Sequence, residues 1–260
     1  MSLILALLAC SSSSDAELIL AGSSTIRPLA EVAAEAFEAG HPGVRVTVQG
    51  GGSGVGVASA RSGLADVGMV SRALTAEEAD LIPRRIARDG IAVICNGARA
   101  EVELSTEQIV AIYTGETEQW PDGRAITVVN KEEGRSTRSL FEHHYGLDGR
   151  FRDDLVVIGP NGQAIATVAA DRDAVAYVSI GSAVQAEAAG VAIRRVPIDG
   201  IEPSVAAVAA GSWPLSRELN LVTAGQPEGL AAEFMDFLLS AEGQGLVVAE
   251  DFVPVGDAAP

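Results

Sequence analysis

The sequence predicts an α/β fold built from two lobes. Strand-like and helix-like patterns alternate along almost the whole chain, which is typical of α/β proteins. The 260 residues are enough for one large domain or two modest ones. The character of the chain changes near Pro203, and two crossings between lobes would explain the order of the segments. We therefore expect a discontinuous first lobe, residues 17–95 plus 200–260, and a second lobe, residues 96–199.

The first lobe begins with a predicted strand, residues 17–21, followed by an amphipathic helix, residues 28–39. The apolar residues of this helix follow the helical spacing, and Pro28 suits a first turn. Valine alternates with polar residues over 44–49, which predicts a half-buried strand. Two further strands are expected at 66–71 and 85–96.

The second lobe continues the alternation. Ser105 and Gln108 make a capping box for a helix that runs to Tyr113. We expect strands at 126–130, 156–159, 174–179 and 191–198, and helices at 136–145, 163–170 and 182–189. The chain then returns through a short helix at 204–210 and a strand at 218–223. A last helix begins near Glu228, and one face of it carries Leu230, Phe234, Phe237, Leu238 and Ala241.

The composition limits the classes of partner. Apolar residues make up 48% of the chain and aromatic residues only 4%, so the core consists mostly of alanine, valine, leucine and isoleucine. The net charge of −17 argues against nucleic acid, because proteins that bind a phosphate backbone usually show a basic footprint. It does not exclude a small anion, since local dipoles and one or two cations can neutralise a buried anion.

The N-terminal residues, MSLILALLAC, hold an apolar run over 3–9, then Cys10 and a serine run. This segment resembles the end of a bacterial lipoprotein signal peptide, which is cleaved before a lipidated cysteine. We expect residues 1–16 to be a signal remnant and tether, with a lipid anchor at Cys10 and a location in the periplasm or at the cell surface. The basic region of a signal peptide is absent, so an ordinary apolar N-terminus is the alternative. A disulfide between Cys10 and Cys95 is a further alternative.

Two serine-containing glycine turns, residues 22–25 and 50–54, each lead into a helical pattern, and a third turn lies at 134–137. Small oxyanions are held well by N–H groups and hydroxyls at helix N-termini, where donors are unsatisfied and the helix dipole is positive. Three such turns meeting at one point would hold an anion. The candidate donors are Ser24, Thr25, Ser53, Ser136 and Thr137. Ordinary helix capping and a flexible loop are the alternatives.

Two further segments add candidate ligands. Ser71 and Arg72 follow a buried-looking strand, and the fork of an arginine suits a tetrahedral anion. The polar segment 131–138 offers the cations Lys131 and Arg135 beside a helix start. A solvated arginine and a charged helix face are the alternatives for these two segments.

The sequence lacks the common patterns of nucleotide-binding and catalytic sites. The glycine turn has no Gly-Lys-Ser/Thr ending, and Ser53 lacks the second glycine of a hydrolase elbow. His143 and His144 are adjacent and have no ligand spacing. We therefore expect no catalytic residue, no metal and no cofactor, and predict that the protein is not an enzyme.

With these turns in view, the chain resembles the substrate-binding protein of high-affinity phosphate ABC transporters (PstS-like), a two-lobed family with the type II periplasmic-binding-protein fold. The matching segments occur in order between residues 17 and 254. They are Ala21-Gly-Ser-Ser-Thr25, Gln49-Gly-Gly-Gly-Ser-Gly54, Ala65-Asp-Val-Gly-Met-Val-Ser-Arg72, Val129-Asn-Lys-Glu-Glu-Gly-Arg-Ser-Thr-Arg138, Ala176-Tyr-Val-Ser179, Pro214-Leu-Ser-Arg217 and Glu242-Gly-Gln244.

The resemblance implies that each lobe is a mixed sheet flanked by helices, with the ligand in the cleft between the lobes. It implies extracytoplasmic binding of inorganic phosphate by a monomer and delivery to an ABC transporter permease. The implied phosphate contacts are Ser24, Thr25, Ser53, Ser71, Ser136 and Thr137.

The chain departs from the family pattern at Lys131, at Ser71 and at Arg135-Ser136-Thr137, where many members carry Ser-Gly-Thr. Many members carry arginine where this chain has Lys131, and some carry an aspartate at the position of Ser71. That carboxylate would accept the proton of hydrogen phosphate and repel sulfate. Binding of sulfate or another oxyanion therefore stays open, as does an anion-sensing lipoprotein of the same fold. An enzyme acting on phosphoesters is a third alternative, and it would need a metal cluster or a nucleophile that the sequence does not show.

Overall fold

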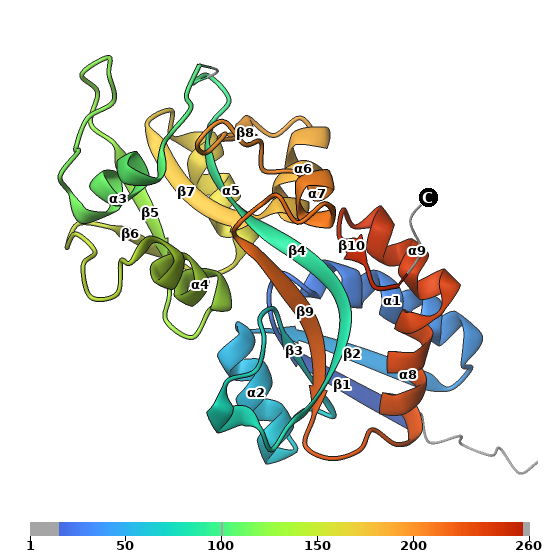
Figure 1. Ribbon diagram of the computed structural model, residues 1–260. Helices are drawn as coiled ribbons and strands as arrows, with labels where there is room; N and C mark the ends of the chain where they lie inside the picture. The colour runs from blue at the N-terminus through green and yellow to red at the C-terminus, as the bar shows by residue number, and fades with distance from the viewer. Residues whose placement is uncertain (1–15, 100, 257–260) are drawn as a thin grey trace, which may run out of the picture.

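The computed structural model describes residues 16–99 and 101–256, and the segment that contains Cys10 lies outside this range. The described residues form an α/β fold in which helices flank one mixed sheet (Figure 1). The strand order is β2-β1-β3-β9-β4-β7-β5-β6, and β8 and β10 both pair with β4. The α/β prediction is confirmed.

The first half of the sheet contains β1 (Ala16–Gly22), which runs parallel to β2 (Val44–Gly50) and to β3 (Val67–Val70). Each of these strands leads toward a turn with polar side chains. The helices of this half are α1 (Arg27–Gly40), α2 (Ser53–Ser62), α8 (Gly229–Leu239) and α9 (Ala241–Ala249).

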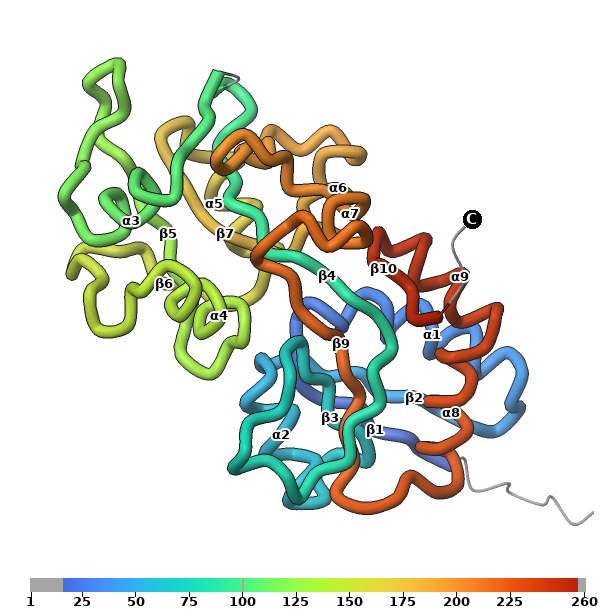
Figure 2. Tube along the Cα trace, viewed as in Figure 1, coloured from blue at the N-terminus to red at the C-terminus, as the bar shows by residue number. Residues whose placement is uncertain are grey.

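Two long strands, β4 (Ile82–Asn96) and β9 (Ser216–Thr223), carry the chain between the halves, as the trace in Figure 2 shows. They pair antiparallel from Ile82 to Gly90 of β4, and from Ile91 onward β4 pairs with β7 (Ala174–Ser179) instead. The sheet therefore changes from one half to the other at Gly90 and Ile91. The predicted lobe boundaries at 95/96 and 199/200 stay predictions.

The second half continues the sheet from β7 to β5 (Thr127–Lys131) and then to β6 (Val156–Ile158), all of them parallel. The short strand β8 (Ile193–Arg195) pairs antiparallel with the end of β4. The helices of this half are α3 (Thr106–Thr114), α4 (Ser136–Tyr145), α5 (Asn161–Ala170), α6 (Ile180–Ala188) and α7 (Val205–Ala209).

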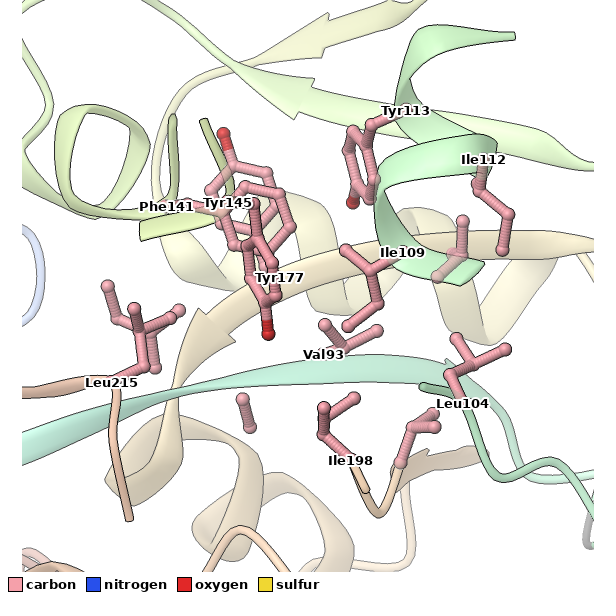
Figure 3. Close-up of a cluster of buried hydrophobic side chains, with 14 of the residues drawn as sticks. Val93, Leu104, Ile109, Ile112, Tyr113, Phe141, Tyr145, Tyr177, Ile198 and Leu215 are labelled. Atoms are coloured by element: carbon pink, nitrogen blue, oxygen red, sulfur yellow. The ribbon is translucent and has the colours of Figure 1, made fainter. Parts of the chain in front are cut away.

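Separate hydrophobic clusters fill the two halves. In the first half, Phe37 of α1 meets Phe234 of α8 edge to face, with the ring centroids 5.3 Å apart. In the second half, Phe141 of α4 stacks on Tyr177 of β7 at 3.9 Å, inside the cluster drawn in Figure 3. Because aromatic pairs add to the stability that burial provides, this stack fixes α4 against the sheet.

The local predictions agree with most of the elements. The capping box of Ser105 and Gln108 is confirmed, and α4 and β7 have the predicted bounds. The prediction of a single last helix is wrong. Ser240 has extended backbone, and its hydroxyl accepts a hydrogen bond from the N–H of Gly243, so Ser240 ends α8 and caps a new helix, α9. The short strand β10 (Val253–Pro254) and the 3-10 turn η1 (Ala76–Glu78) were not predicted.

Within the described ranges, no helix combines the length and the apolar character that a bilayer crossing requires.

Candidate functional site

Four buried serine hydroxyls meet between the two halves of the molecule, and we call Ser23, Ser53, Ser71 and Ser136 the hydroxyl cluster. The Oγ of Ser71 lies 2.6 Å from that of Ser136 and 2.9 Å from that of Ser23. The Oγ of Ser53 lies 2.9 Å from that of Ser136. Each serine is at most 4% exposed, so the hydroxyls bond with one another rather than with bulk solvent.

Four different connections of the fold bring these hydroxyls to one place. Ser23 lies in the turn between β1 and α1, Ser71 follows β3, and Ser53 and Ser136 are the first residues of α2 and α4. The first turn of α2 and the turn before α4 also touch directly, because the N–H of Gly54 donates to the carbonyl of Gly134 at 3.0 Å. The N-termini of two helices from opposite halves therefore point their positive dipoles at the cluster.

Close backbone packing explains why this region is rich in glycine. A Cβ on Gly56 would lie 2.5 Å from the carbonyl oxygen of Met69 and 3.0 Å from that of Ala21. A Cβ on Gly22 would lie 2.4 Å from the same Met69 oxygen, and the backbone of Gly22 has a φ of 134°. Glycine at these two positions lets the first turn of α2 pack against the ends of β1 and β3, which brings Ser53 within reach of Ser71.

Arg217 of β9 joins the two halves beside the hydroxyl cluster. Its Nη2 donates to the hydroxyl of Thr25 at 3.0 Å, and its Nη1 donates to the hydroxyl of Thr137 at 2.8 Å. Its Nε and Nη2 also donate to Oδ2 of Asp89. The side chains of Arg217 and Asp89 are each 1% exposed, so a buried cation lies between two threonines of the predicted site.

Lys131 adds a second cation at the end of β5. The residue is 2% exposed, and its Nζ is buried without a hydrogen-bond partner. Burial, together with the positive charges of Arg135 and Arg217, lowers the pKa of Lys131 to about 7. A buried ammonium with no acceptor is costly, and an anion beside it would supply the missing partner.

Lys131 is held in place by the core described above. The hydroxyl of Tyr177 donates to Oδ1 of Asn130, and the same oxygen accepts from the N–H of Lys131 at 2.8 Å. Because Tyr177 also stacks on Phe141 of α4, the strand that carries Lys131 and the helix that carries Ser136 rest on one aromatic pair.

Arg135 lies at the edge of the cluster. Its Nε and Nη2 donate to Oε2 of Glu132, and its Nη1 reaches the hydroxyl of Ser24 at 3.5 Å. The side chain is 11% exposed. Arg135 therefore reaches across from the second half to the turn before α1, with part of its charge balanced by Glu132.

Asn161, the first residue of α5, contacts the same region from another side. Its Nδ2 lies 3.2 Å from the hydroxyl of Thr25 and 3.2 Å from that of Ser182, at the start of α6. The residue is 3% exposed, and its Oδ1 is buried without a partner. A third helix N-terminus thus reaches the predicted site.

Eight of the nine predicted site residues come together in this way. They are Ser24, Thr25, Ser53, Ser71, Lys131, Arg135, Ser136 and Thr137.

Arg72 requires a correction, because it does not join them. Its Nη1 and Nη2 form a two-pronged ion pair with Glu78 at 2.6 and 2.7 Å. Glu78 is held there by the N–H of Thr75, which starts a short 3-10 turn, and the nearby guanidinium lowers the pKa of this glutamate. Arg72 thus stabilises the chain after β3, and Ser71 alone of this segment reaches the hydroxyl cluster.

Sequence reasoning missed Ser23, Asn161 and the pair of Arg217 and Asp89. Ser23 lies inside the predicted turn 22–25, and Arg217 lies inside the family-like segment 214–217, so both have a local signal in the sequence. Asn161 and Asp89 occupy a helix start and a strand and have no local pattern that marks a ligand.

Hydrogen-bond donors outnumber free acceptors around the hydroxyl cluster. Within 16–99 and 101–256, no group of three histidine, cysteine or acidic residues could hold a metal ion. The carboxylates near the cluster, Asp89 and Glu132, are each bound to an arginine. A cavity of about 480 Å³ in the second half, lined in part by Leu104, Ile112 and Trp120, contains none of the site residues. The hydroxyls, the cations and the helix N-termini together form a site rich in hydrogen-bond donors.

Comparisons with known proteins agree with this architecture. The model of the PBP superfamily domain matches residues 9–242. The phosphate-binding protein PstS of Bacillus subtilis is 28% identical over 251 residues, which cover 92% of this chain and 81% of that protein.

Two solved structures are similar over most of the chain. A phosphate ABC transporter substrate-binding protein from Clostridium perfringens, solved with bound phosphate, is 29% identical with a TM-score of 0.85 and covers 92% of this chain and 100% of its own. A phosphate transport receptor from Vibrio cholerae is 28% identical with a TM-score of 0.73, again over 92% and 100% of the two chains. Because the family model matches most of the chain, this chain belongs to the PBP superfamily.

Proposed function

We propose that the protein binds inorganic phosphate and delivers it to the permease of an ABC transporter. The observation that carries the proposal is the meeting of serine and threonine hydroxyls from both halves around buried cations. The names of the similar proteins, which describe phosphate binding and phosphate transport, support the same function.

The chemistry of the site suits a small tetrahedral dianion. Arg217 and Lys131 provide positive charge, and the hydroxyls and helix N-termini provide neutral donors around it. A hydrogen bond to a charged group contributes about 1.5–3 kcal/mol. A handful of them is enough for about −8 kcal/mol, which corresponds to a dissociation constant near one micromolar, after the cost of ordering the site.

The position of the site explains how binding and release would work. Ser53 and Ser71 belong to the first half, whereas Ser136 and Thr137 belong to the second. The anion would bind to the turns of one half, and contacts from the other half would then close the site around it. The permease would recognise this closed arrangement.

The remaining features of the proposal follow from the sequence. We propose a monomer in the periplasm or at the cell surface, tethered through a lipid on Cys10. The protein would bind and release its ligand unchanged, without a metal or a cofactor.

Calorimetric titration of the protein with phosphate, sulfate, arsenate and molybdate tests the binding function. The protein is expected to bind phosphate, and Ser53→Asp is expected to abolish the binding, because a buried carboxylate would lie against the anion. Ala58→Asp is the matched control, since Ala58 is exposed on the same helix. Circular dichroism and thermal unfolding establish that both variants are folded.

Two results would count against the proposal. Unchanged phosphate affinity in Ser53→Asp would show that the anion does not bind at the hydroxyl cluster. Tighter binding of sulfate or molybdate than of phosphate would show that the ligand is another oxyanion. Delivery is tested separately, by asking whether the phosphate-loaded protein stimulates ATP hydrolysis by its transporter.

A further inference from the structure

Asn161 is tied into the phosphate site by its amide nitrogen alone. Its Nδ2 donates to the hydroxyls of Thr25 and Ser182, both at 3.2 Å. Thr25 in turn accepts from Arg217, so two hydrogen bonds through Thr25 connect Asn161 to the buried guanidinium of Arg217. With Nδ2 directed at these two hydroxyls, Oδ1 is a buried acceptor without a partner.

Three buried side-chain atoms of the described residues have no hydrogen-bond partner. They are Lys131 Nζ, Asn161 Oδ1 and Arg152 Nη1, and Arg152 belongs to an ion pair with Asp154 elsewhere in the second half. The ammonium of Lys131 can only donate, whereas an amide oxygen can only accept. A ligand that satisfies both needs acceptor oxygens and at least one hydrogen of its own.

The two carboxylates near the site already accept hydrogen bonds from protein groups, so they are not free to accept the hydrogen of a ligand. Asp89 already accepts from Arg217 and from the N–H of Gly181, and Glu132 accepts from Arg135. The serine hydroxyls can turn their hydrogens either way, so they bond equally well to an ionised oxygen and to a P–OH group. An amide oxygen cannot adapt in this way, and it repels an oxygen that carries no hydrogen.

We propose that Asn161 sets the preference of the site for protonated oxyanions, with Oδ1 accepting the hydrogen of phosphate. This inference rests on the proposed function and names the residue that gives it specificity. Phosphate and arsenate keep a hydrogen at neutral pH and satisfy Asn161. Sulfate and molybdate do not, and they leave the buried oxygen unpaired. Sites built to pair with a hydroxyl of the ligand reject analogues that lack it for this reason.

Two substitutions distinguish the acceptor role of Asn161 Oδ1 from the donor role of its Nδ2. Asn161→Leu removes both, whereas Asn161→Asp removes the donor to Thr25 and keeps an acceptor. Calorimetry at pH 6 is expected to show that phosphate affinity falls about ten-fold or more in Asn161→Leu and falls less in Asn161→Asp. If Asn161 only positioned Thr25, the added negative charge would make Asn161→Asp the weaker binder, and that order would overturn the inference.

The ratio of sulfate to phosphate dissociation constants gives a second readout, with sulfate measured as a competitor at constant ionic strength. The ratio is expected to fall about ten-fold in Asn161→Leu. Ser182→Ala is the control, because it removes the other partner of Nδ2 and leaves Oδ1 in place, so its ratio should match that of the unmodified protein. An equal ratio in all three proteins would refute the role of Asn161, whereas absence of phosphate binding by the unmodified protein would refute the proposed function itself.

Discussion

Arg217 and Asp89 face each other on β9 and β4, and their side chains form an ion pair that is almost completely buried. The distance between Arg217 Nη2 and Asp89 Oδ2 is 2.8 Å. The pair stands next to Gly90, where β4 leaves β9 and begins to pair with β7. Arg217 reaches Thr25 and Thr137 from this position, so the central cation of the site is anchored at the crossing between the halves.

We expect Asp89→Asn to lower the free energy of unfolding by about 3 kcal/mol or more, because it leaves a buried guanidinium without a countercharge. Urea unfolding followed by circular dichroism measures this change in the free energy of unfolding. Phosphate should recover part of the loss, since a bound anion replaces the missing charge. The control is Asp236→Asn in the exposed pair with Arg84, which should cost at most about 1 kcal/mol. Equal effects of the two substitutions would contradict the prediction.

Arg217→Lys is expected to weaken phosphate binding by about ten-fold or more, because a lysine cannot hold Asp89, Thr25 and Thr137 at once. The matched control is Arg72→Lys, which disturbs the pair with Glu78 outside the site. Calorimetry should find the phosphate affinity of the control within about two-fold of the unmodified protein. A larger loss in Arg72→Lys than in Arg217→Lys would return Arg72 to the site.

Lys131→Met should stabilise the protein at low pH and lose this effect at high pH. The folded protein holds the pKa of Lys131 at about 7, below the ordinary value of 10.5. Between pH 7 and pH 10.5 the unfolded chain therefore binds more protons than the folded protein. Burial of Lys131 lowers the free energy of unfolding by its full amount below pH 7 and by progressively less up to pH 10.5. Thermal unfolding at pH 6 and pH 10, without phosphate, compares the two proteins. A gain in melting temperature that is the same at both pH values would show that the charge of Lys131 is not responsible.

Gly56→Ala is expected to destabilise the protein and to weaken phosphate binding together, because its Cβ would collide with the carbonyl oxygens of Met69 and Ala21. The first turn of α2 would have to move, and Ser53 would move with it. Gly245→Ala in α9 is the control, since no atom lies within 4 Å of its added Cβ, and it should stabilise the helix by about 0.5–1 kcal/mol. Denaturant unfolding and calorimetry of both variants measure the two effects. Full phosphate affinity in Gly56→Ala would contradict the packing argument.

The sequence predicted the parts of the site that have a local signature. Ser53 and Ser136 each combine a hydroxyl with a preceding glycine turn and a following helix, so the pattern predicted both the helix start and a hydroxyl that reaches the hydroxyl cluster. The same reasoning placed Arg72 at the site, and it failed because Glu78 is a nearer partner than the cluster. Arginines can satisfy their charge in several directions, and the local sequence does not decide among them.

The missed residues depend on contacts between distant segments. Arg217 contacts Thr137 and Thr25, which lie 80 and 192 positions away in the chain. Only the antiparallel pairing of β4 with β9 brings Asp89 to it, and that register is a property of the whole sheet. The break at Ser240 was missed for a different reason, since apolar residues continue on both sides and hide the new helix start.

Three serines of the hydroxyl cluster are joined by contacts in which either oxygen can be the donor, between Ser53 and Ser71, Ser53 and Ser136, and Ser71 and Ser136. Rotation about a single C–O bond is enough to reverse the direction of each contact. The oxygen atoms can therefore keep their positions while the donor and acceptor roles of the hydroxyls reverse around a bound anion. Such a lining adjusts to the protonation state of a ligand by turning hydrogens alone, without moving the backbone that carries it.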